Sequence, residues 1–408
     1  MQPTHIAALG ELRVIGHDHA VRLAISWLTM FLLGTELFVV SPLLPLISAD
    51  FQSSPALTGL SVAIFALTYM ISAPLFGRLA DRIGRRRVLI CCLCAFAAAN
   101  LLTAASGNLL CLLAARLLAG AVAAGVSPSV YALVAGIAPL GRSATWLAVV
   151  VSGLLVSLAI GAPIGGVAGA AVGWPSVFFA LAAASLVLAW LNTQIWPRDN
   201  TGDNVTTPAE GMSILALAPR LGPMVAWSTA LYGMYTYLGV GLASSGHSAA
   251  QIAEVIAVYG CGAIVGVLIG GRASDILGAQ STSGLSLAGL GASFLLLRFA
   301  LEEGVMIDFA FGLVSAVAQT FFPAQQCGLA NDFPERRATV LAWNSSALFL
   351  GISLGSLIGG QVLAVGGFAT NLTISALIAA GGWAVHRISI SKGTLMPPRR
   401  SRRRSTAM

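Results

Sequence analysis

The chain has 408 residues, of which 57% are hydrophobic and only 9% are charged, and its mean hydropathy is +0.86. Soluble globular proteins carry about 25% charged residues, so this composition excludes a soluble fold and indicates a protein that crosses a membrane several times. The formal net charge of +7 would suit a nucleic-acid partner, but no part of the sequence interleaves basic and aromatic residues for bases to stack on. We therefore expect a lipid bilayer as a partner and no nucleic acid.

Twelve apolar segments are long enough to cross a bilayer as helices. They cover residues 21–47, 57–80, 88–105, 109–137, 143–170, 174–195, 221–243, 249–271, 282–301, 304–329, 338–365 and 367–386. The fold class that follows is an all-α integral membrane protein with twelve transmembrane helices. The six cysteines lie inside these segments, so we interpret them as small apolar residues rather than as disulfides or a metal site.

Basic residues indicate which side of the membrane each connection faces. All 22 lysines and arginines except Arg116 and Arg298 lie in the two tails or beside connections that follow even-numbered segments. Because cytoplasmic connections carry an excess of Lys and Arg, both termini are predicted to be cytoplasmic. The first 20 residues contain charged side chains and no apolar core, so no cleavable signal peptide is expected.

One long polar stretch divides the segments into two groups of six and is predicted to be a flexible linker. The predicted organisation is a cytoplasmic tail at 1–20, an N-terminal six-helix bundle at 21–195, a cytoplasmic linker at 196–220, a C-terminal six-helix bundle at 221–388 and a basic cytoplasmic tail at 389–408.

The two groups of segments repeat each other at a constant offset of 194 residues. Matching pairs include Gly77 and Gly271, Asp81 and Asp275, Gly84 and Gly278, Gly161 and Gly355, and Gly165 and Gly359. Such a repeat predicts two bundles related by an axis along the membrane normal, with a substrate site between them near the bilayer midplane.

The connection between the second and third segments, residues 77–87, reads GRLADRIGRRR. It holds one acid, Asp81, among five arginines, and its glycines permit a sharp turn. This loop resembles the signature loop of the major facilitator superfamily, which joins the second and third helices of that family. The matching residues are Gly77, Leu79, Asp81, Arg82, Gly84, Arg85, Arg86 and Leu89. An ordinary basic loop is the alternative, which the full spacing of the motif disfavours.

The resemblance implies the fold of that family and a cytoplasmic gate built on this loop. In the gate, Asp81 would meet the start of segment 338–365, where Arg336 and the helix dipole favour an anion. The residues that we assign to the gate are Gly77, Asp81, Arg82, Gly84, Arg85, Arg86 and Arg336.

Segment 143–170 carries glycine or serine at every fourth position, a stripe that lets another helix approach closely. Its residues Gly161, Pro163, Gly165 and Gly166 resemble, with an imperfect match, the antiporter motif of proton-coupled exporters in the superfamily. The resemblance implies export rather than uptake. Ordinary helix packing is the alternative interpretation.

Glu36 is the only acid in the apolar interior of the first six segments. A charged carboxyl is costly in hydrocarbon, so Glu36 is expected to exchange protons near neutral pH, as proton coupling requires. Arg116 and Gly120 resemble the R-x-x-x-G pattern of the family's fourth helix, whose arginine is linked to proton transfer. The alternatives are a permanently protonated Glu36 and an Arg116 that only bonds polar groups of the bundle.

The resemblance also implies that the first, fourth, seventh and tenth segments line the substrate cavity. The candidate contacts there are Tyr131, Tyr232, Tyr235 and Gln319, whose aromatic and amide groups suit a partly apolar ligand. A packing role is the alternative for each of them.

Two phrases, GTELFVVSPLLPLISADF and YGMYTYLG, resemble drug:proton antiporters that export arabinose-like sugars, nucleosides or chloramphenicol. We expect a proton-coupled efflux transporter in a bacterial cytoplasmic (inner) membrane, acting as a monomer on a small-molecule substrate and protons. An uptake symporter and a non-transporting membrane receptor are the rival interpretations. The sequence contains no nucleophile triad, metal-ligand cluster or Walker-type loop, so neither an enzyme nor a cofactor is expected.

Overall fold

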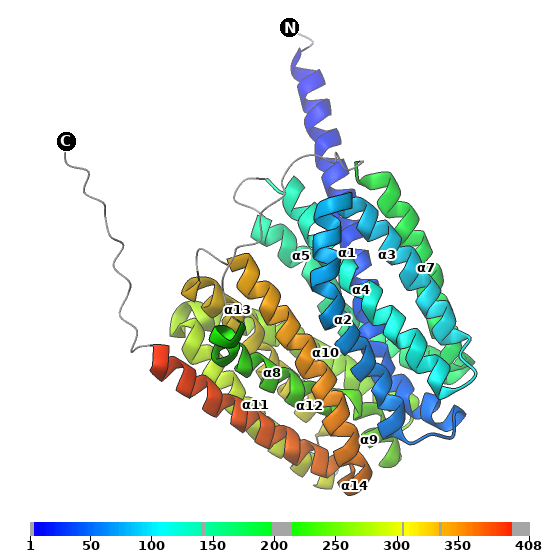
Figure 1. Cartoon of the computed structure of the whole chain (residues 1–408), viewed down its shortest axis with the longest axis vertical. Helices are drawn as coiled ribbons and strands as arrows, with labels where there is room; N and C mark the ends of the chain where they lie inside the picture. The colour runs from blue at the N-terminus through cyan, green and yellow to red at the C-terminus, as the bar shows by residue number, and fades with distance from the viewer. Residues whose placement is uncertain (1–3, 140–142, 198–213, 304–305, 334–336, 394–408) are drawn as a thin grey trace, which may run out of the picture.

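The computed structural model describes residues 4–139, 143–197, 214–303, 306–333 and 337–393. In those ranges the chain forms long helices joined by short connections (Figure 1). The first half (blue to green) and the second half (green through yellow to red) form two bundles that lie side by side. The all-helical fold predicted from the sequence is confirmed.

The first bundle comprises the helices that precede the long linker. They are α1 (Thr4–Asp50), α2 (Pro55–Ile83), α3 (Arg85–Ala104), α4 (Leu109–Ile137), α5 (Ser143–Val156), the π-helical turn η1 (Ser157–Gly161), α6 (Ala162–Val172) and α7 (Trp174–Ile195). Because α5, η1 and α6 follow one another without a break, they make up one predicted span.

The second bundle comprises the helices that follow the linker. They are α8 (Ile214–Thr236), α9 (Leu238–Ser244), α10 (Ala249–Leu277), α11 (Ala279–Glu303), α12 (Ile307–Gln319), α13 (Phe321–Asp332) and α14 (Arg337–Gly393). Within the described ranges, ten helices are long and apolar enough to cross a membrane. The last of these contains two predicted spans, and α8 with α9 supplies one more, so all twelve predicted spans coincide with helices.

The backbone carries the repeat that the sequence predicts. Gly84 ends α2 with a φ of 97°, and Gly278, 194 residues later, ends α10 with a φ of 86°. Gly173 separates α6 from α7 with a φ of 98°, and its counterpart Gly367 has a φ of 73° inside α14. Glycine adopts this left-handed region without the steric cost that other residues meet, so both halves make the same turns. Gly367 therefore marks the boundary between the two spans within α14.

Helical structure extends into the predicted tails and linker. α1 begins at Thr4, inside the stretch predicted as a cytoplasmic tail, and α14 continues to Gly393. α8 begins at Ile214, so the end of the predicted linker is helical, while 198–213 lie outside the described residues. Composition distinguishes apolar from polar stretches, but it does not show how far a helix continues past the membrane surface.

Pro163 accounts for the π-helical turn η1. Proline has no backbone N–H, and its ring crowds the carbonyl four residues earlier, here that of Ala159. η1 holds one extra residue in this turn, and the Ala162 amide donates to the Ser157 carbonyl, five residues back. The counterpart of the proline in the second half is Leu357, which keeps its N–H, and α14 remains α-helical there.

Candidate functional site

The structure joins Glu36 of α1 to Arg116 of α4 in a salt bridge. The two residues are 80 positions apart in the chain, and both side chains are fully buried, with 0% and 1% of their surface exposed. Among the described residues, they are the only buried Asp, Glu, Lys or Arg side chains. Burying two charges is costly unless they are paired. The attraction between Glu36 and Arg116 therefore offsets the desolvation cost of placing each group inside the membrane.

Each member of the pair keeps an unused polar atom. Oε2 of Glu36 and Nε of Arg116 have no hydrogen-bond partner among the described residues. The guanidinium carbon of Arg116 lies 4.6 Å from the centre of the Phe65 ring in α2, a cation–π contact. Each residue thus has a buried polar atom that no described residue satisfies, which is costly in an interior of low dielectric constant.

Of the four residues predicted to line a substrate cavity, three line the same cavity in the structure and one does not. Tyr232, Tyr235 and Gln319 line one small cavity between the bundles, whereas Tyr131 is not among its lining residues. The remaining lining residues, which the sequence-based prediction missed, are Phe38, Leu158, Leu231 and Tyr259. Tyr259 lies on α10, outside the four segments expected to line the cavity. The one sequence feature that could have pointed to it is a tyrosine inside an apolar segment.

The cavity is aromatic and closed in this conformation. Tyr235 contacts the Tyr259 ring at a centroid distance of 5.3 Å and the Phe38 ring at 5.8 Å. The space inside admits about one water molecule, so it is too small for a drug-sized molecule in this conformation.

Hydrogen bonds close one end of the interface between the bundles. We call this the far end, where α1 ends, and we call the opposite end, which carries the turn between α2 and α3, the loop end. The Ser41 hydroxyl donates to the Tyr235 carbonyl at 2.5 Å, and the Tyr235 hydroxyl donates to the Phe38 carbonyl at 3.0 Å. The Ser356 hydroxyl of α14 donates to the Gly59 carbonyl of α2 at 2.7 Å. Ser41 and Tyr235 are 194 residues apart, so equivalent positions of the repeat meet here.

At the loop end, the described residues show the following surroundings for the predicted gate. Asp81 is exposed, and the described residues offer it no ion pair. A side chain added at Gly77 would meet nothing within 4 Å. Arg82 and Arg85 are also exposed, and Gly84 makes the turn described above.

Two other gate residues are accounted for separately. Arg86 donates to the Thr193 carbonyl at 2.8 Å, which ties the start of α3 to the end of α7. Arg336 lies outside the described residues, so its contact with Asp81 stays a prediction.

The predicted antiporter motif packs against α1. Gly161, Pro163, Gly165 and Gly166 are all buried. A Cβ at Gly161 would collide with the side chain of Thr35 in α1. The second half repeats this arrangement, because a Cβ at Gly355 would collide with the Thr229 backbone of α8, and these residues are the counterparts of Gly161 and Thr35. Close approach of the two helices is therefore common to both bundles, and only the proline is particular to the first.

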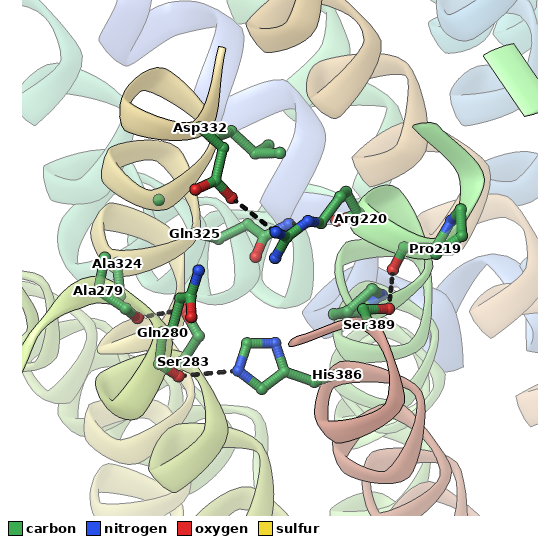
Figure 2. A pocket seen from close by; sticks show the side chains of 13 residues that line it. Pro219, Arg220, Ala279, Gln280, Ser283, Ala324, Gln325, Asp332, His386 and Ser389 are labelled. Atoms are coloured by element: carbon green, nitrogen blue, oxygen red, sulfur yellow. Dashed lines mark hydrogen bonds and ion pairs between the residues drawn. The ribbon is translucent and has the colours of Figure 1, made fainter. Parts of the chain in front are cut away.

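A separate polar cavity lies inside the second bundle (Figure 2). Arg220 of α8 and Asp332 of α13 point toward one another and form an ion pair at 3.2 Å, and the Gln325 amide donates to the Arg220 carbonyl at 2.8 Å. Nε2 of His386 in α14 hydrogen-bonds the Gln280 carbonyl of α11 at 2.8 Å. These contacts connect four helices, so we interpret the cavity as a brace of the second bundle.

The amino-acid sequence matches the profile of one known protein family. The profile of the Major Facilitator Superfamily matches residues 26–246, more than half of the chain. The chain belongs to the major facilitator superfamily. It is accordingly a membrane transporter of a small-molecule substrate and not an enzyme.

Bacterial proteins resemble the chain over much of its length. YceJ of Bacillus subtilis (strain 168), an uncharacterized MFS-type transporter, is 28% identical over 348 residues, which are 83% of this chain and 88% of YceJ. A chloramphenicol resistance protein of Streptomyces lividans is 30% identical over 257 residues, 61% of this chain and 65% of that protein.

A solved structure confirms the superfamily fold over nearly the whole chain. A bacterial homologue of the human lysosomal transporter Spinster, crystallised in an inward-facing and occupied conformation, superposes with a TM-score of 0.75. The two proteins are 15% identical, and the match covers 90% of this chain and 96% of the other. This likeness supports the two-bundle architecture from which the site above is built.

Proposed function

We propose that this transporter is a proton-coupled antiporter that exports a small, partly apolar molecule, with Glu36 and Arg116 as its protonation site. The observation that carries the proposal is the buried salt bridge between these two side chains. A proton that reaches Glu36 removes the carboxylate charge and leaves Arg116 uncompensated. Because Arg116 stays charged, the first bundle must then find another arrangement around its guanidinium.

In a mechanism of alternating access, the charge of Glu36 would be linked to the arrangement of the two bundles. In this scheme, an ionised Glu36 keeps the salt bridge to Arg116 intact while the far end of the interface is closed, the arrangement found in the structure. Protonation of Glu36 from outside, as substrate leaves, would neutralise the carboxylate in the outward-open state and permit the return, and loss of the proton to the cytoplasm would then restore the salt bridge seen here. Transport in opposite directions follows because proton and substrate favour different bundle arrangements.

We further propose that the loop end is cytoplasmic and that Asp81 closes it in the alternate conformation. The distribution of basic residues supports this orientation. The exposed position of Asp81 supports a gate that is open here and closes when the far end opens.

The cavity supports a substrate with apolar or aromatic surface and few charges. Its lining is dominated by tyrosine, phenylalanine and leucine, with the Gln319 amide as a polar contact. The similarity to a chloramphenicol resistance protein makes a neutral aromatic drug the first compound to test.

The test is substrate-induced proton movement in proteoliposomes that contain a pH dye. A panel of chloramphenicol, nucleosides, pentoses and cationic dyes is added outside, and proton flux and its direction are recorded. We expect one compound to drive flux in the parent protein, and Glu36→Gln to abolish it. The amide carbonyl of glutamine still accepts a hydrogen bond from Arg116, so folding should be retained.

Glu254→Gln is the matched control, because it makes the same change in an exposed acid of α10. Flux that persists in Glu36→Gln would remove Glu36 as the proton carrier. Substrate and protons moving in the same direction would identify a symporter instead.

A further inference from the structure

We propose that three aromatic side chains, Phe65, Tyr69 and Phe349, transmit the charge state of the Glu36–Arg116 pair to the interface between the bundles. The inference rests on the proposed function, since it assumes that the pair takes up a proton. It assigns positioning roles to residues that do not touch the proton.

The first link joins the ion pair to α2. The Phe65 ring is buried and lies under the guanidinium of Arg116, 4.6 Å from its central carbon. The described contacts of that guanidinium are the Glu36 carboxylate and this ring. When Glu36 is neutral, the face of the Phe65 ring becomes the main contact that stabilises the positive charge of Arg116. Protonation of Glu36 therefore makes the cation–π contact between Arg116 and Phe65 more important.

The second link runs along α2. Tyr69 follows Phe65 by four residues, so the two side chains lie on the same face of the helix, one turn apart. Their ring centroids are 6.5 Å apart. The Tyr69 hydroxyl also donates to the Ser127 hydroxyl of α4 at 3.4 Å, which fixes the ring against the helix that carries Arg116.

The third link crosses to the second bundle. The Tyr69 ring stacks on Phe349 of α14, with centroids 3.6 Å apart and planes inclined by 14°. Tyr69 is the last buried residue of α2, and the remainder of the helix toward the loop end is partly or fully exposed. The stack therefore lies where the packed interface between α2 and α14 gives way to open surface.

The far end of the same helix pair is fixed by the hydrogen bond between Ser356 and Gly59. Gly59 and Tyr69 are ten residues apart, which corresponds to about 15 Å along α2. If the middle of α2 shifts while its Gly59 end stays tied, the helix pivots about the tied end, and its loop end moves farthest. A change at Phe65 can thus alter the separation of α2 and α14 at the loop end.

Few other charges bear on this chain of contacts. α1 packs against α2, α4, α5, η1, α6, α7, α8, α9 and α10, and among the described residues of these helices Arg116 is the only buried Asp, Glu, Lys or Arg besides Glu36 itself. The other titratable group in the chain of contacts is the Tyr69 phenol. The response to pH is therefore expected to depend on the pair itself.

The experiment measures the distance between spin labels at Leu79 and Ser345, exposed positions toward the loop ends of α2 and α14. The full-length protein, with its native cysteines replaced, is placed in lipid nanodiscs and titrated from pH 5 to pH 9. We expect a pH-dependent change in the parent and none in Glu36→Gln. Phe65→Leu should move the midpoint to lower pH by roughly 0.4 to 1.5 units, because it removes the contact that stabilises Arg116 beside a neutral Glu36.

Two variants test the crossing to the second bundle. Phe349→Leu should reduce the amplitude of the distance change by half or more, whereas Tyr69→Phe, which keeps the ring, should retain it. Phe96→Leu is the control, because it removes a ring of α3 that is as fully buried as Phe65 and has no place in the chain of contacts.

The outcomes separate this inference from the proposed function. If Glu36→Gln abolishes the pH response but Phe65→Leu and Phe349→Leu match the parent, only the inference is overturned. If Phe96→Leu has the same effect as the other two, general loosening explains the data and the inference is likewise overturned. If the parent shows no pH response that depends on Glu36, the proposed protonation site fails first.

Discussion

At the scale of single residues, the most informative feature is a buried ion pair whose members differ chemically. Glutamate can take up a proton and become neutral, whereas arginine remains charged at every accessible pH. Both members of the pair are buried, and no other Asp, Glu, Lys or Arg side chain is buried among the described residues. Removing one partner should therefore have unequal consequences for the two residues.

We predict that Glu36→Leu destabilises the protein more than Arg116→Leu. Breaking a buried pair by removing one partner costs about 3–5 kcal/mol, and Glu36→Leu should reach that range because Arg116 stays charged. Arg116→Leu should cost less, because Glu36 can accept a proton and become neutral. Thermal unfolding in detergent would measure both, and the double variant should recover stability without recovering transport. Equal losses in the two single variants would contradict this account.

At the scale of elements, the span formed by α5, η1 and α6 shows how two features of one motif act separately. Its glycines allow close packing against α1, and the second bundle keeps the equivalent glycine at Gly355. Its proline produces a π-helical turn that the second bundle lacks. Packing is thus a shared requirement of both bundles, while the irregular turn is a local property of the first.

We predict that Gly161→Ala destabilises the protein by about 1–3 kcal/mol, because the added methyl group collides with Thr35 and separates α1 from η1. The matched control is Gly136→Ala in α4, where an added Cβ meets nothing within 4 Å. That control should be neutral or stabilise by up to about 1 kcal/mol through higher helix propensity. Thermal unfolding of both variants measures the difference, and loss of stability in both would show that packing at Gly161 is not the cause.

At the scale of the whole molecule, the interface between the bundles is closed at one end and exposed at the other. The far end is held by side-chain hydrogen bonds to backbone carbonyls of the opposite bundle, at Tyr235, Phe38 and Gly59. Each of these hydrogen bonds contributes only a little free energy. Together they hold the far end closed, and each can break at a small cost when the bundles separate. In the alternating-access cycle that we propose, this conformation is the one closed at the far end.

We predict that Ser356→Ala shifts this equilibrium toward the state that is open at the far end. Losing one hydrogen bond worth about 1 kcal/mol changes the equilibrium constant about fivefold. The measurement is the labelling rate of a cysteine introduced at the buried Leu238, using a maleimide that does not cross the membrane. Ser185→Ala is the control, because that hydroxyl bonds within α7 and touches no other bundle. An unchanged rate in Ser356→Ala would show that this bond does not hold the far end closed.

The sequence alone determined the fold class, the number of spans and the internal repeat. These features depend on the transfer of apolar side chains into lipid and on glycine positions with unusual backbone angles, both of which are properties of local sequence. The repeat predicted from residues such as Gly84 and Gly278 reappears as equal turns in the backbone. The family followed from the same local motifs.

Only the tertiary structure decided which distant side chains meet. The sequence singled out Glu36 and Arg116 separately, but their pairing depends on how α1 packs against α4. It missed Phe65 and Tyr259, because an aromatic residue inside an apolar helix looks the same whether it faces lipid, a guanidinium or a cavity. It also grouped Tyr131 with residues whose cavity it does not line. Periodicity places a residue on a helix face, whereas the neighbour of that face is set by how the helices pack in three dimensions.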